Sequence, residues 1–308
     1  MPLILFAAPA LWPEYRDALP RALAQAGISA QVVTEADPHA VDYIVYAPSA
    51  PLQDFAPFVR TRAVLSLWAG VERVVRNPTL TQPLCRMVDP ALTEGMVEWV
   101  TGHALRFHLG MDRHIVNPGR LWDPTTPPIA RERPVTVLGL GELGLAAARA
   151  LAALNFPVRG WSRTEKHIQG LETYHGEDGL DAALTGAQIV ITLLPRTPGT
   201  DNILNARTLA LPARGAAVLN PGRGPLIDDD ALLAALDSGQ IGQATLDVFR
   251  VEPLPADHPF WAHPKVTVTP HIAADTRADS ASAVLAENIR RGEAGEPFLH
   301  LVDRARGY

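Results

Sequence analysis

The sequence predicts an α/β protein built in two parts, each with a parallel sheet that helices cover. Short apolar runs alternate with helical stretches along the chain, and a glycine-rich turn joins one apolar run to a helix near the middle. Alternating strands and helices favour parallel sheets, because each helix returns the chain to the same edge of the sheet. At 308 residues, of which 47% are hydrophobic, the chain is long enough for two cores of ordinary size.

The pattern of apolar runs in the first part of the chain predicts a small α/β layer. Its short apolar runs, several of them rich in β-branched residues, are typical of buried strands. The expected strands are residues 3–7, 30–33, 43–46, 63–67 and 86–88. The expected helices are residues 14–26, 54–59 and 71–75, followed by a long helix from residue 91 to residue 113.

The second part follows a proline-rich connector at residues 117–134. Its apolar runs again alternate with helical stretches, so the same layered arrangement continues. The expected strands are residues 134–138, 157–161, 187–194, 218–220, 243–248 and 266–269. The expected helices are residues 142–155, 229–238 and 275–292.

The turn at residues 139–144 (GLGELG) has the spacing of a dinucleotide-binding motif. It follows an apolar run and precedes an Ala- and Leu-rich helix that begins at Glu142, which is the context this motif requires. Gly139 suits the tight turn, Gly141 lets the backbone approach a pyrophosphate, and Gly144 lets the helix pack closely on the strand. Because backbone amides and the helix dipole stabilise the anion, we predict a Rossmann-type domain.

The residues after the second strand of this domain indicate which dinucleotide binds. NAD enzymes usually carry an acid there, which binds the ribose 2′-hydroxyl and would repel a 2′-phosphate. Here Ser162 takes that position and Arg163 follows it, with Thr164 and Lys166 close behind. Because a guanidinium fork suits phosphate, these residues predict NADP(H), with NAD(H) as the less favoured cofactor. The alternative is an exposed basic turn that binds nothing.

Three polar residues in the last third of the chain each come shortly after an expected strand: Arg223, Glu252 and His271. The carboxyl ends of parallel strands meet at one edge of an open sheet, so we expect these side chains in one crevice. Asp247, also at a strand end, is expected to orient a nicotinamide carboxamide. Each residue also has an ordinary interpretation, as a surface turn arginine, a loop histidine or a solvated carboxylate.

This set fits hydride transfer to a 2-keto acid. The fork of Arg223 can bind the carboxylate and ketone oxygens, and its charge stabilises the negative charge that develops on the ketone. His271 is the expected proton donor, because an unperturbed imidazole titrates at about pH 6.5. Glu252 is expected to orient the ring and to favour its protonated form.

Composition argues against several other classes. A net charge of −6 without a dense Lys/Arg block disfavours nucleic acid and anionic membranes as partners. The apolar start of the chain lacks a basic segment, so we interpret it as a strand rather than a signal peptide. Cys85 is the single cysteine, so no intrachain disulfide is expected and a cytoplasmic location is predicted. His258 and His263 have no usual zinc spacing with His271, so no metal is predicted.

Several segments resemble the D-isomer-specific 2-hydroxyacid dehydrogenases, and within that family the subgroup that reduces glyoxylate and hydroxypyruvate. They are residues 161–163 (WSR), 193–195 (LLP), 218–220 (VLN), 231–239 (ALLAALDSG), 246–249 (LDVF), 252–255 (EPLP), 269–274 (TPHIAA) and 302–308 (VDRARGY). The resemblance implies a homodimer that uses NADPH, with the arginine, glutamate and histidine in the roles given above. It also implies a Rossmann-type nucleotide domain, residues 101–274, inserted into a flavodoxin-like α/β substrate domain, residues 1–100 and 275–308.

Further binding residues are assigned through the same resemblance. Besides the glycine turn, Leu143, Leu194, Pro195 and Thr200 are expected to contact the cofactor. Leu143 lies within the glycine turn, and Leu194, Pro195 and Thr200 lie at or after the end of the strand expected at residues 187–194.

The family holds the substrate carboxylate on backbone amides of a Gly-Ala-Gly-Val turn in the first domain. Here Trp68 replaces the first glycine, before Ala69 and Gly70, and we expect this bulky residue to change the preferred substrate size. Tyr46 is expected near the substrate, because relatives carry a substrate-facing tryptophan in a neighbouring segment. Gly222, before the catalytic arginine, follows Pro221 in place of a more ordinary residue, a departure that bears on the stiffness of that loop and not on the role of Arg223.

Two alternatives stay open. One is a dinucleotide-sensing binding protein, similar to corepressors with this fold, although the complete arginine, glutamate and histidine set argues against it. The other is a dehydrogenase of a different 2-hydroxy acid. Formate dehydrogenases usually carry Gln at the position of Glu252, and phosphoglycerate dehydrogenases usually carry an acid at the position of Ser162 and a longer tail.

Overall fold

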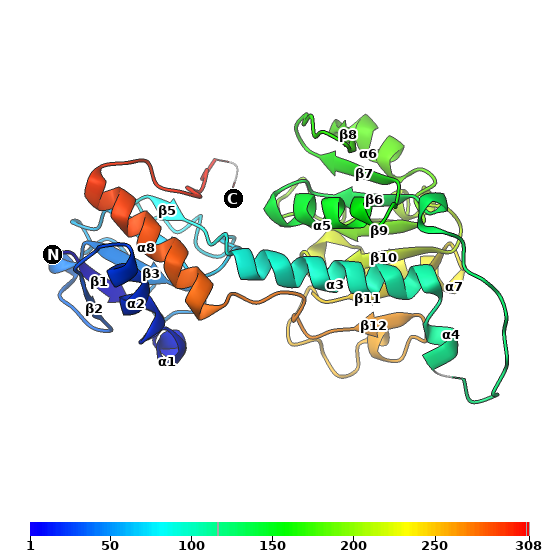
Figure 1. Cartoon of the computed structure of the whole chain (residues 1–308), viewed down its shortest axis with the longest axis horizontal. Helices are drawn as coiled ribbons and strands as arrows, with labels where there is room; N and C mark the ends of the chain where they lie inside the picture. The colour runs from blue at the N-terminus through cyan, green and yellow to red at the C-terminus, as the bar shows by residue number, and fades with distance from the viewer. Residues whose placement is uncertain (116, 306, 308) are drawn as a thin grey trace. The chain divides into compact units, whose positions relative to one another are not determined.

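The computed structural model describes residues 1–115, 117–305 and 307, which form two compact units (Figure 1). One unit comprises Met1–Leu92 and Asp275–Tyr308, and the other comprises Thr93–Ala274. The division falls in the first turn of helix α3 (Pro90–Leu109), whereas the sequence analysis placed it at residue 100, in the middle of that helix. Val116, Arg306 and Tyr308 lie outside the described residues, and the last two belong to the tail that carries part of the resemblance.

The first unit has a parallel five-stranded sheet in the order β2-β1-β3-β4-β5, which is the flavodoxin-like order. Its strands are β1 (Leu3–Phe6), β2 (Gln31–Val33), β3 (Tyr43–Tyr46), β4 (Ala63–Ser66) and β5 (Leu84–Cys85). Its helices are α1 (Trp12–Tyr15), α2 (Ala18–Gln25) and α8 (Ala278–Ala294). The last helix packs on the core of this unit, where Gly292 leaves no room for a Cβ atom beside the hydroxyl of Tyr43.

The second unit has a parallel seven-stranded sheet in the order β12-β11-β10-β9-β6-β7-β8. Numbered along the unit, its first six strands have the 3-2-1-4-5-6 order of a Rossmann fold, and a seventh extends the sheet. The strands are β6 (Val135–Leu138), β7 (Val158–Ser162), β8 (Glu172–His175), β9 (Ile189–Thr192), β10 (Ala216–Asn220), β11 (Ile241–Leu246) and β12 (Val266–Val268). The predicted fold class, including the insertion, is confirmed.

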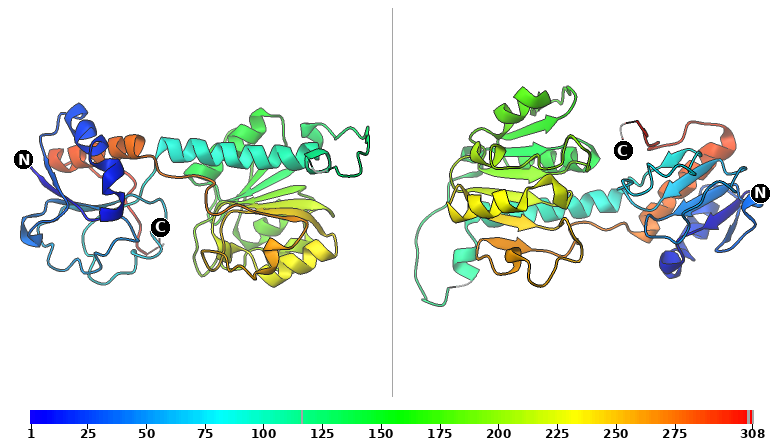
Figure 2. Two further views of the ribbon diagram at one scale, coloured as in Figure 1. Left: turned by 90° about the horizontal axis from the view of Figure 1, so that it is seen from below. Right: turned by 180° about the vertical axis from the view of Figure 1, so that it is seen from behind.

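Helices cover both faces of this sheet (Figure 2). Residues of α3 and of α5 (Glu142–Ala153) pack on one face in one hydrophobic cluster. Residues of α6 (Gly176–Leu184) and α7 (Asp229–Asp237) pack in the cluster of the opposite face. A short helix, α4 (Asp112–Ile115), follows α3. Among the described residues, none of the helices combines the length and the hydropathy that a membrane crossing requires.

Four predicted elements of the first unit differ in the structure. Residues 54–59 and 71–75 form turns rather than helices. In the first of these segments the backbone bonds to side chains distant in sequence: the hydroxyl of Thr79 accepts from the amide of Phe55, and the side-chain amide of Gln82 donates to the Phe55 carbonyl. The predicted helix 14–26 is two helices, since Pro20 has no N–H to continue α1. The predicted strand 86–88 is wrong, because β5 ends at Cys85.

Two elements of the second unit, β8 and α6, were not predicted from the sequence. The strand reads ETYH, with half-exposed or exposed side chains, because it lies at the edge of the sheet. Edge strands lack the apolar pattern that identifies a buried strand, so this omission has a physical cause.

Candidate active site

The three predicted catalytic residues follow neighbouring strands of one sheet. Arg223 comes shortly after β10, Glu252 after β11 and His271 after β12. All strands of this sheet run parallel, so these residues lie at its carboxyl edge, as does the glycine turn after β6. The second unit alone therefore carries the whole predicted catalytic set.

His271 and Glu252 are in direct contact. Nδ1 of His271 lies 2.7 Å from Oε2 of Glu252, and Oε1 of the same carboxylate accepts a hydrogen bond from the amide of Phe249 at 2.9 Å. A carboxylate held at both oxygens fixes the ring that it contacts. Because Nδ1 faces Glu252, Nε2 is the nitrogen left to exchange a proton with a substrate.

The backbone of His271 adopts a left-handed conformation with φ of +56°, which is uncommon for a residue other than glycine. Its amide donates to the carbonyl oxygen of Asp247 at 2.8 Å. The buried carboxylate of Asp247 accepts from the amides of Ile272 and Ala273, each at 2.9 Å, and from the hydroxyl of Thr269 at 2.6 Å. Asp247 thus holds the loop that presents His271, a role that the sequence analysis did not foresee.

A second histidine lies near this carboxylate. Burial is the main reason that the pKa of His103 on α3 is lowered, and the charge of Arg106 lowers it further. The negative charge of Asp247 acts in the opposite direction. Burial and the nearby arginine thus both disfavour a proton on His103.

Arg223 lies in a tight turn between β10 and a short 3₁₀ helix, Gly224–Leu226. Its Nη1 donates to the carbonyl oxygen of Gly222 at 2.7 Å, and the side chain is half-buried. A Cβ atom on Gly224 would lie 2.0 Å from the carbonyl carbon of Phe249. The turn of Arg223 therefore packs directly against the turn that holds Glu252.

The glycine turn has the geometry of a dinucleotide cradle. Gly139 has a φ of +106°, and a Cβ atom there would lie 2.3 Å from the carbonyl oxygen of Leu193. A Cβ atom on Gly144 would lie 1.8 Å from the carbonyl oxygen of Gly139, whereas one on Gly141 would meet nothing within 4 Å. The turn is closed where helix meets strand and open where a pyrophosphate is expected, so the residues fit the cofactor.

Replacing Gly144 and Gly141 by alanine, one at a time, should separate the effect on protein stability from the effect on cofactor binding. We expect Gly144→Ala to destabilise the protein by about 1–3 kcal/mol, because the new methyl group overpacks the turn. We expect Gly141→Ala to leave thermal stability unchanged and to weaken NADPH binding. Thermal unfolding and cofactor titration of both variants test this, and equal stability of the two would contradict the assignment.

The basic turn after β7 lies beside the glycine turn, since β6 and β7 are paired. Ser162 is buried and its hydroxyl donates to the carbonyl of Thr164 at 2.8 Å, whereas Arg163 and Thr164 are exposed. Nζ of Lys166 donates to the carbonyl oxygen of Leu140 at 2.6 Å, which connects the two turns. Contact of these residues with a 2′-phosphate stays a prediction.

The remaining predicted cofactor residues lie around the same edge. Leu143 is in the first turn of α5 beside Glu142, and Leu194 and Pro195 follow β9, the strand next to β6. The hydroxyl of Thr200 donates to the carbonyl oxygen of Pro195 at 2.8 Å. Thr200 thus stabilises the loop, and direct contact with the cofactor stays a prediction.

Of the predicted substrate residues of the first unit, Tyr46 is the last residue of β3, and Trp68, Ala69 and Gly70 follow β4. Trp68 is 37% exposed, and its carbonyl oxygen accepts from the amide of Met87 at 3.1 Å. Ala69 and Gly70 are half-buried. Tyr46 is 1% exposed and packs edge-on against Phe55, so we correct its expected place near a substrate: its ring belongs to the core.

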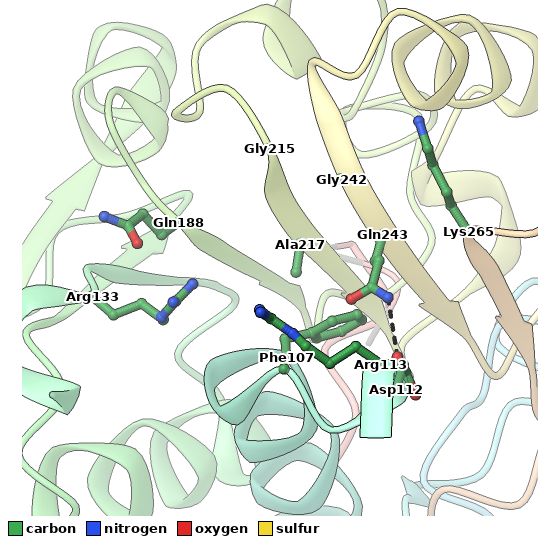
Figure 3. Close-up of a pocket in the computed structure, with 11 residues that line it drawn as sticks. Phe107, Asp112, Arg113, Arg133, Gln188, Gly215, Ala217, Gly242, Gln243 and Lys265 are labelled. Carbon is green, nitrogen blue, oxygen red and sulfur yellow. Dashed lines mark hydrogen bonds between the residues drawn. The ribbon is translucent and has the colours of Figure 1, made fainter. Parts of the chain in front are cut away.

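A pocket of about 350 Å³ lies at the opposite edge of the same sheet (Figure 3). Gly215, Gly242 and Lys265 line it: Gly215 and Lys265 directly precede β10 and β12, and Gly242 is the second residue of β11. Within it, Nε2 of Gln243 donates to Oδ2 of Asp112 at 3.0 Å. This pocket is therefore separate from the predicted catalytic residues. Among the described residues, no group of His, Cys, Asp or Glu side chains could hold a metal ion.

Comparison with known proteins agrees with this geometry. A family model for the D-isomer specific 2-hydroxyacid dehydrogenase, NAD binding domain, matches residues 107–273. A glyoxylate/hydroxypyruvate reductase A from Yersinia enterocolitica is 40% identical over 281 residues, which cover 88% of this chain and 89% of that protein.

Two solved structures extend the likeness to the whole fold. A D-isomer specific 2-hydroxyacid dehydrogenase from Xanthobacter autotrophicus, in complex with NADPH and MES, is 40% identical with a TM-score of 0.92, covering 100% of this chain and 99% of that chain. An NADPH-dependent glyoxylate/hydroxypyruvate reductase from Sinorhizobium meliloti, in complex with NADP and sulfate, is 36% identical with a TM-score of 0.83 and the same coverage.

The fold and the set at the strand ends define an oxidoreductase that uses a nicotinamide dinucleotide. The chain belongs to the D-isomer specific 2-hydroxyacid dehydrogenase family. The resemblance that the sequence analysis stated is confirmed.

Proposed function

We propose that this protein is an NADPH-dependent reductase of small 2-keto acids, which converts glyoxylate to glycolate and hydroxypyruvate to glycerate. The observation that carries the proposal is the 2.7 Å contact between His271 and Glu252, at the edge of the sheet that also bears Arg223 and the glycine turn. The relatives named above support the same substrates and cofactor. The direct test is oxidation of NADPH when glyoxylate is added.

In the proposed reaction, NADPH held at the glycine turn would supply the hydride for the 2-oxo carbon, which is a ketone in hydroxypyruvate and an aldehyde in glyoxylate. His271 donates the proton on Nε2 to the ketone oxygen, while Nδ1 stays bonded to the carboxylate of Glu252. The negative charge of Glu252 stabilises the protonated ring before transfer and keeps it oriented afterwards. The hydride forms the new C–H bond, the carbonyl π electrons move to oxygen, and the proton forms the new O–H bond, so the carbonyl group becomes the hydroxyl group of the product.

Arg223 acts on the substrate in two ways. Its fork binds the substrate carboxylate, which fixes the ketone beside the proton donor. Its positive charge also stabilises the negative charge that grows on the ketone oxygen as the hydride arrives. The turn that packs on Phe249 supports this role, because it holds the arginine against the segment that carries Glu252.

The preference for NADPH over NADH rests on Arg163. We expect Arg163→Ala to raise the KM for NADPH by about 10- to 150-fold, because charge-assisted hydrogen bonds to a phosphate contribute about 1.5–3 kcal/mol. The KM for NADH should change little, since NADH has no 2′-phosphate. Arg207→Ala is a matched control, because Arg207 is an exposed arginine of the same unit that pairs with Asp181 at 2.6 Å. An unchanged ratio of the two KM values would remove the argument for NADPH.

We also propose a cytoplasmic homodimer. Around the connector between α4 and β6, apolar side chains are exposed: Ile115 is 69% exposed, Leu121 69% and Trp122 91%. Exposed apolar clusters of this kind mark protein–protein contacts. A second copy of the chain is the partner that the family resemblance implies. The buried thiol of Cys85, which has no disulfide, agrees with a reducing compartment.

Trp122→Ser should therefore shift the protein from dimer to monomer. Light scattering after size-exclusion chromatography measures the mass directly. Trp261→Ser serves as the control, because Trp261 is 52% exposed but lies on a different segment, a 3₁₀ helix before β12. A dimer that persists unchanged in Trp122→Ser would rule out this surface.

A further inference from the structure

The side chain of Asn220 is a buried polar group at the end of β10 that the proposed reaction does not use. It is 1% exposed and lies three residues before Arg223. Its Oδ1 accepts from the hydroxyl of Thr192 at 2.6 Å and from the amide of Gly222 at 3.1 Å. Its Nδ2 donates to the carbonyl oxygen of Arg223 at 3.0 Å. The side-chain amide of Asn220 thus bonds to the backbone N–H of Gly222 and to the backbone carbonyl of Arg223, which lie on either side of the peptide bond between these two residues.

The orientation of this amide follows from its partners. The backbone amide of Gly222 can only donate, and the carbonyl of Arg223 can only accept, so oxygen and nitrogen cannot exchange places without losing both bonds. Burial makes the loss of either bond costly, because the freed backbone group would be left unsatisfied. The side chain therefore acts as a rigid clamp on the turn.

Two further contacts confine the same turn. A Cβ atom on Gly222 would lie 2.7 Å from the carbonyl oxygen of Thr192, so this strand end packs directly against β9. The backbone carbonyl of Asn220 accepts from the amide of Asp247 at 3.0 Å, and Asp247 holds the loop of His271. Asn220 therefore connects the turn that carries Arg223 with Asp247, which holds the loop that carries His271.

We propose that Asn220 is a positioning residue for Arg223, whose side-chain amide fixes the backbone from which the guanidinium reaches the substrate. The inference rests on the proposed function, because it assumes that Arg223 binds a keto acid. Both polar atoms of the Asn220 side chain are bonded to protein groups, Oδ1 to Thr192 and Gly222 and Nδ2 to Arg223. Its effect is transmitted through the carbonyl of Arg223 and the amide of Gly222.

The test is Asn220→Asp, which keeps the shape and the acceptor oxygen but loses the donor to the Arg223 carbonyl. We expect kcat/KM for glyoxylate to fall by about 10- to 100-fold, with most of the change in KM, because a 1 Å misplacement of a substrate-positioning group can cost about 10²-fold. The Kd for NADPH should stay within a factor of about two, because the glycine turn is untouched. Should Asn220→Asp fail to fold, Asn220→Ser, which retains a hydroxyl donor in a smaller volume, replaces it.

Two matched controls isolate the clamp. Thr192→Val removes the hydroxyl that donates to Oδ1 but leaves both bonds between Asn220 and the turn, so activity should stay close to that of the wild type. Asn205→Asp makes the same change in another turn of the unit, where Nδ2 donates to the carbonyl of Asn202 at 2.8 Å and Oδ1 accepts from the amide of Arg207 at 3.0 Å. It should leave KM for glyoxylate unchanged.

A double-mutant cycle separates positioning from general support. If Asn220 acts through Arg223, Asn220→Asp should cause little further loss in an Arg223→Ala background. Full activity of Asn220→Asp, or an equal further loss in the Arg223→Ala background, would overturn the inference while the proposed function stands. Full activity of Arg223→Ala would overturn both, so the two failures are distinguishable.

Discussion

Arg223→Ala is expected to lower kcat/KM for glyoxylate by at least about 10³-fold, because it removes both the carboxylate fork and the charge that stabilises the developing oxyanion. NADPH binding should stay largely intact, since the arginine follows β10 whereas the glycine turn follows β6. Steady-state kinetics and a separate NADPH titration measure the two effects.

Arg214→Ala is the control for this variant. Arg214 lies in the same unit, and its Nη2 donates to the carbonyl oxygen of Ser238 at 2.6 Å at an exposed site. Its loss should leave turnover unchanged. Arg223→Lys keeps the charge but not the fork and should recover only part of the lost activity. Equal losses of turnover and of NADPH affinity in Arg223→Ala would contradict the assigned role.

His271→Gln is expected to lower kcat by about 10²- to 10⁴-fold, which is the range for loss of a general acid. Glutamine can still accept or donate a hydrogen bond but cannot deliver a proton. KM for the keto acid should change less than kcat, because Arg223 is left to bind the carboxylate. Rates measured across pH for the wild type and the variant test this role.

His263→Gln provides the comparison for His271. His263 lies on the same stretch of chain, and its Nε2 faces the carboxylate of Asp237 at 3.4 Å. We expect wild-type kcat in this control. A His271→Gln enzyme with the kcat of the wild type would show that the proton comes from another group.

Much of this arrangement could be predicted from the sequence, because the signals are local. The glycine turn needs residues without a side chain where helix, strand and phosphate meet, so the spacing of Gly139, Gly141 and Gly144 carries the geometry directly. The contact between His271 and Glu252 could be expected because both follow strands whose carboxyl ends share one edge. Their catalytic roles remain predictions.

What escaped prediction depends on contacts distant in sequence. Asn220 looks like the last residue of an apolar strand, and only the fold shows that its amide faces the turn of Arg223. The carboxylate of Asp247 binds backbone amides 25 and 26 residues away, which no spacing pattern indicates. A short Asn–x–Gly segment that begins at the last residue of a buried strand is the signal that could have indicated the first of these.

Tyr46 shows the limit of reasoning from resemblance. Its position in the family suggested a substrate contact, but an aromatic ring at a strand end can face either the core or the surface. Packing against Phe55 decides this, and it places the ring inside. The alternation of side chains along a strand predicts which face a residue occupies only when neighbouring residues differ in polarity. All residues of β3 are buried, so alternation does not place the ring of Tyr46.

The most direct measurement is the absorbance of reduced nicotinamide after glyoxylate or hydroxypyruvate is added to the protein with NADPH. Catalytic turnover by the wild type, lost in Arg223→Ala and His271→Gln, is the predicted result. Tight binding of NADPH by a folded protein that consumes none of it with any small 2-keto acid would contradict the account, and would instead support a dinucleotide-sensing protein without turnover.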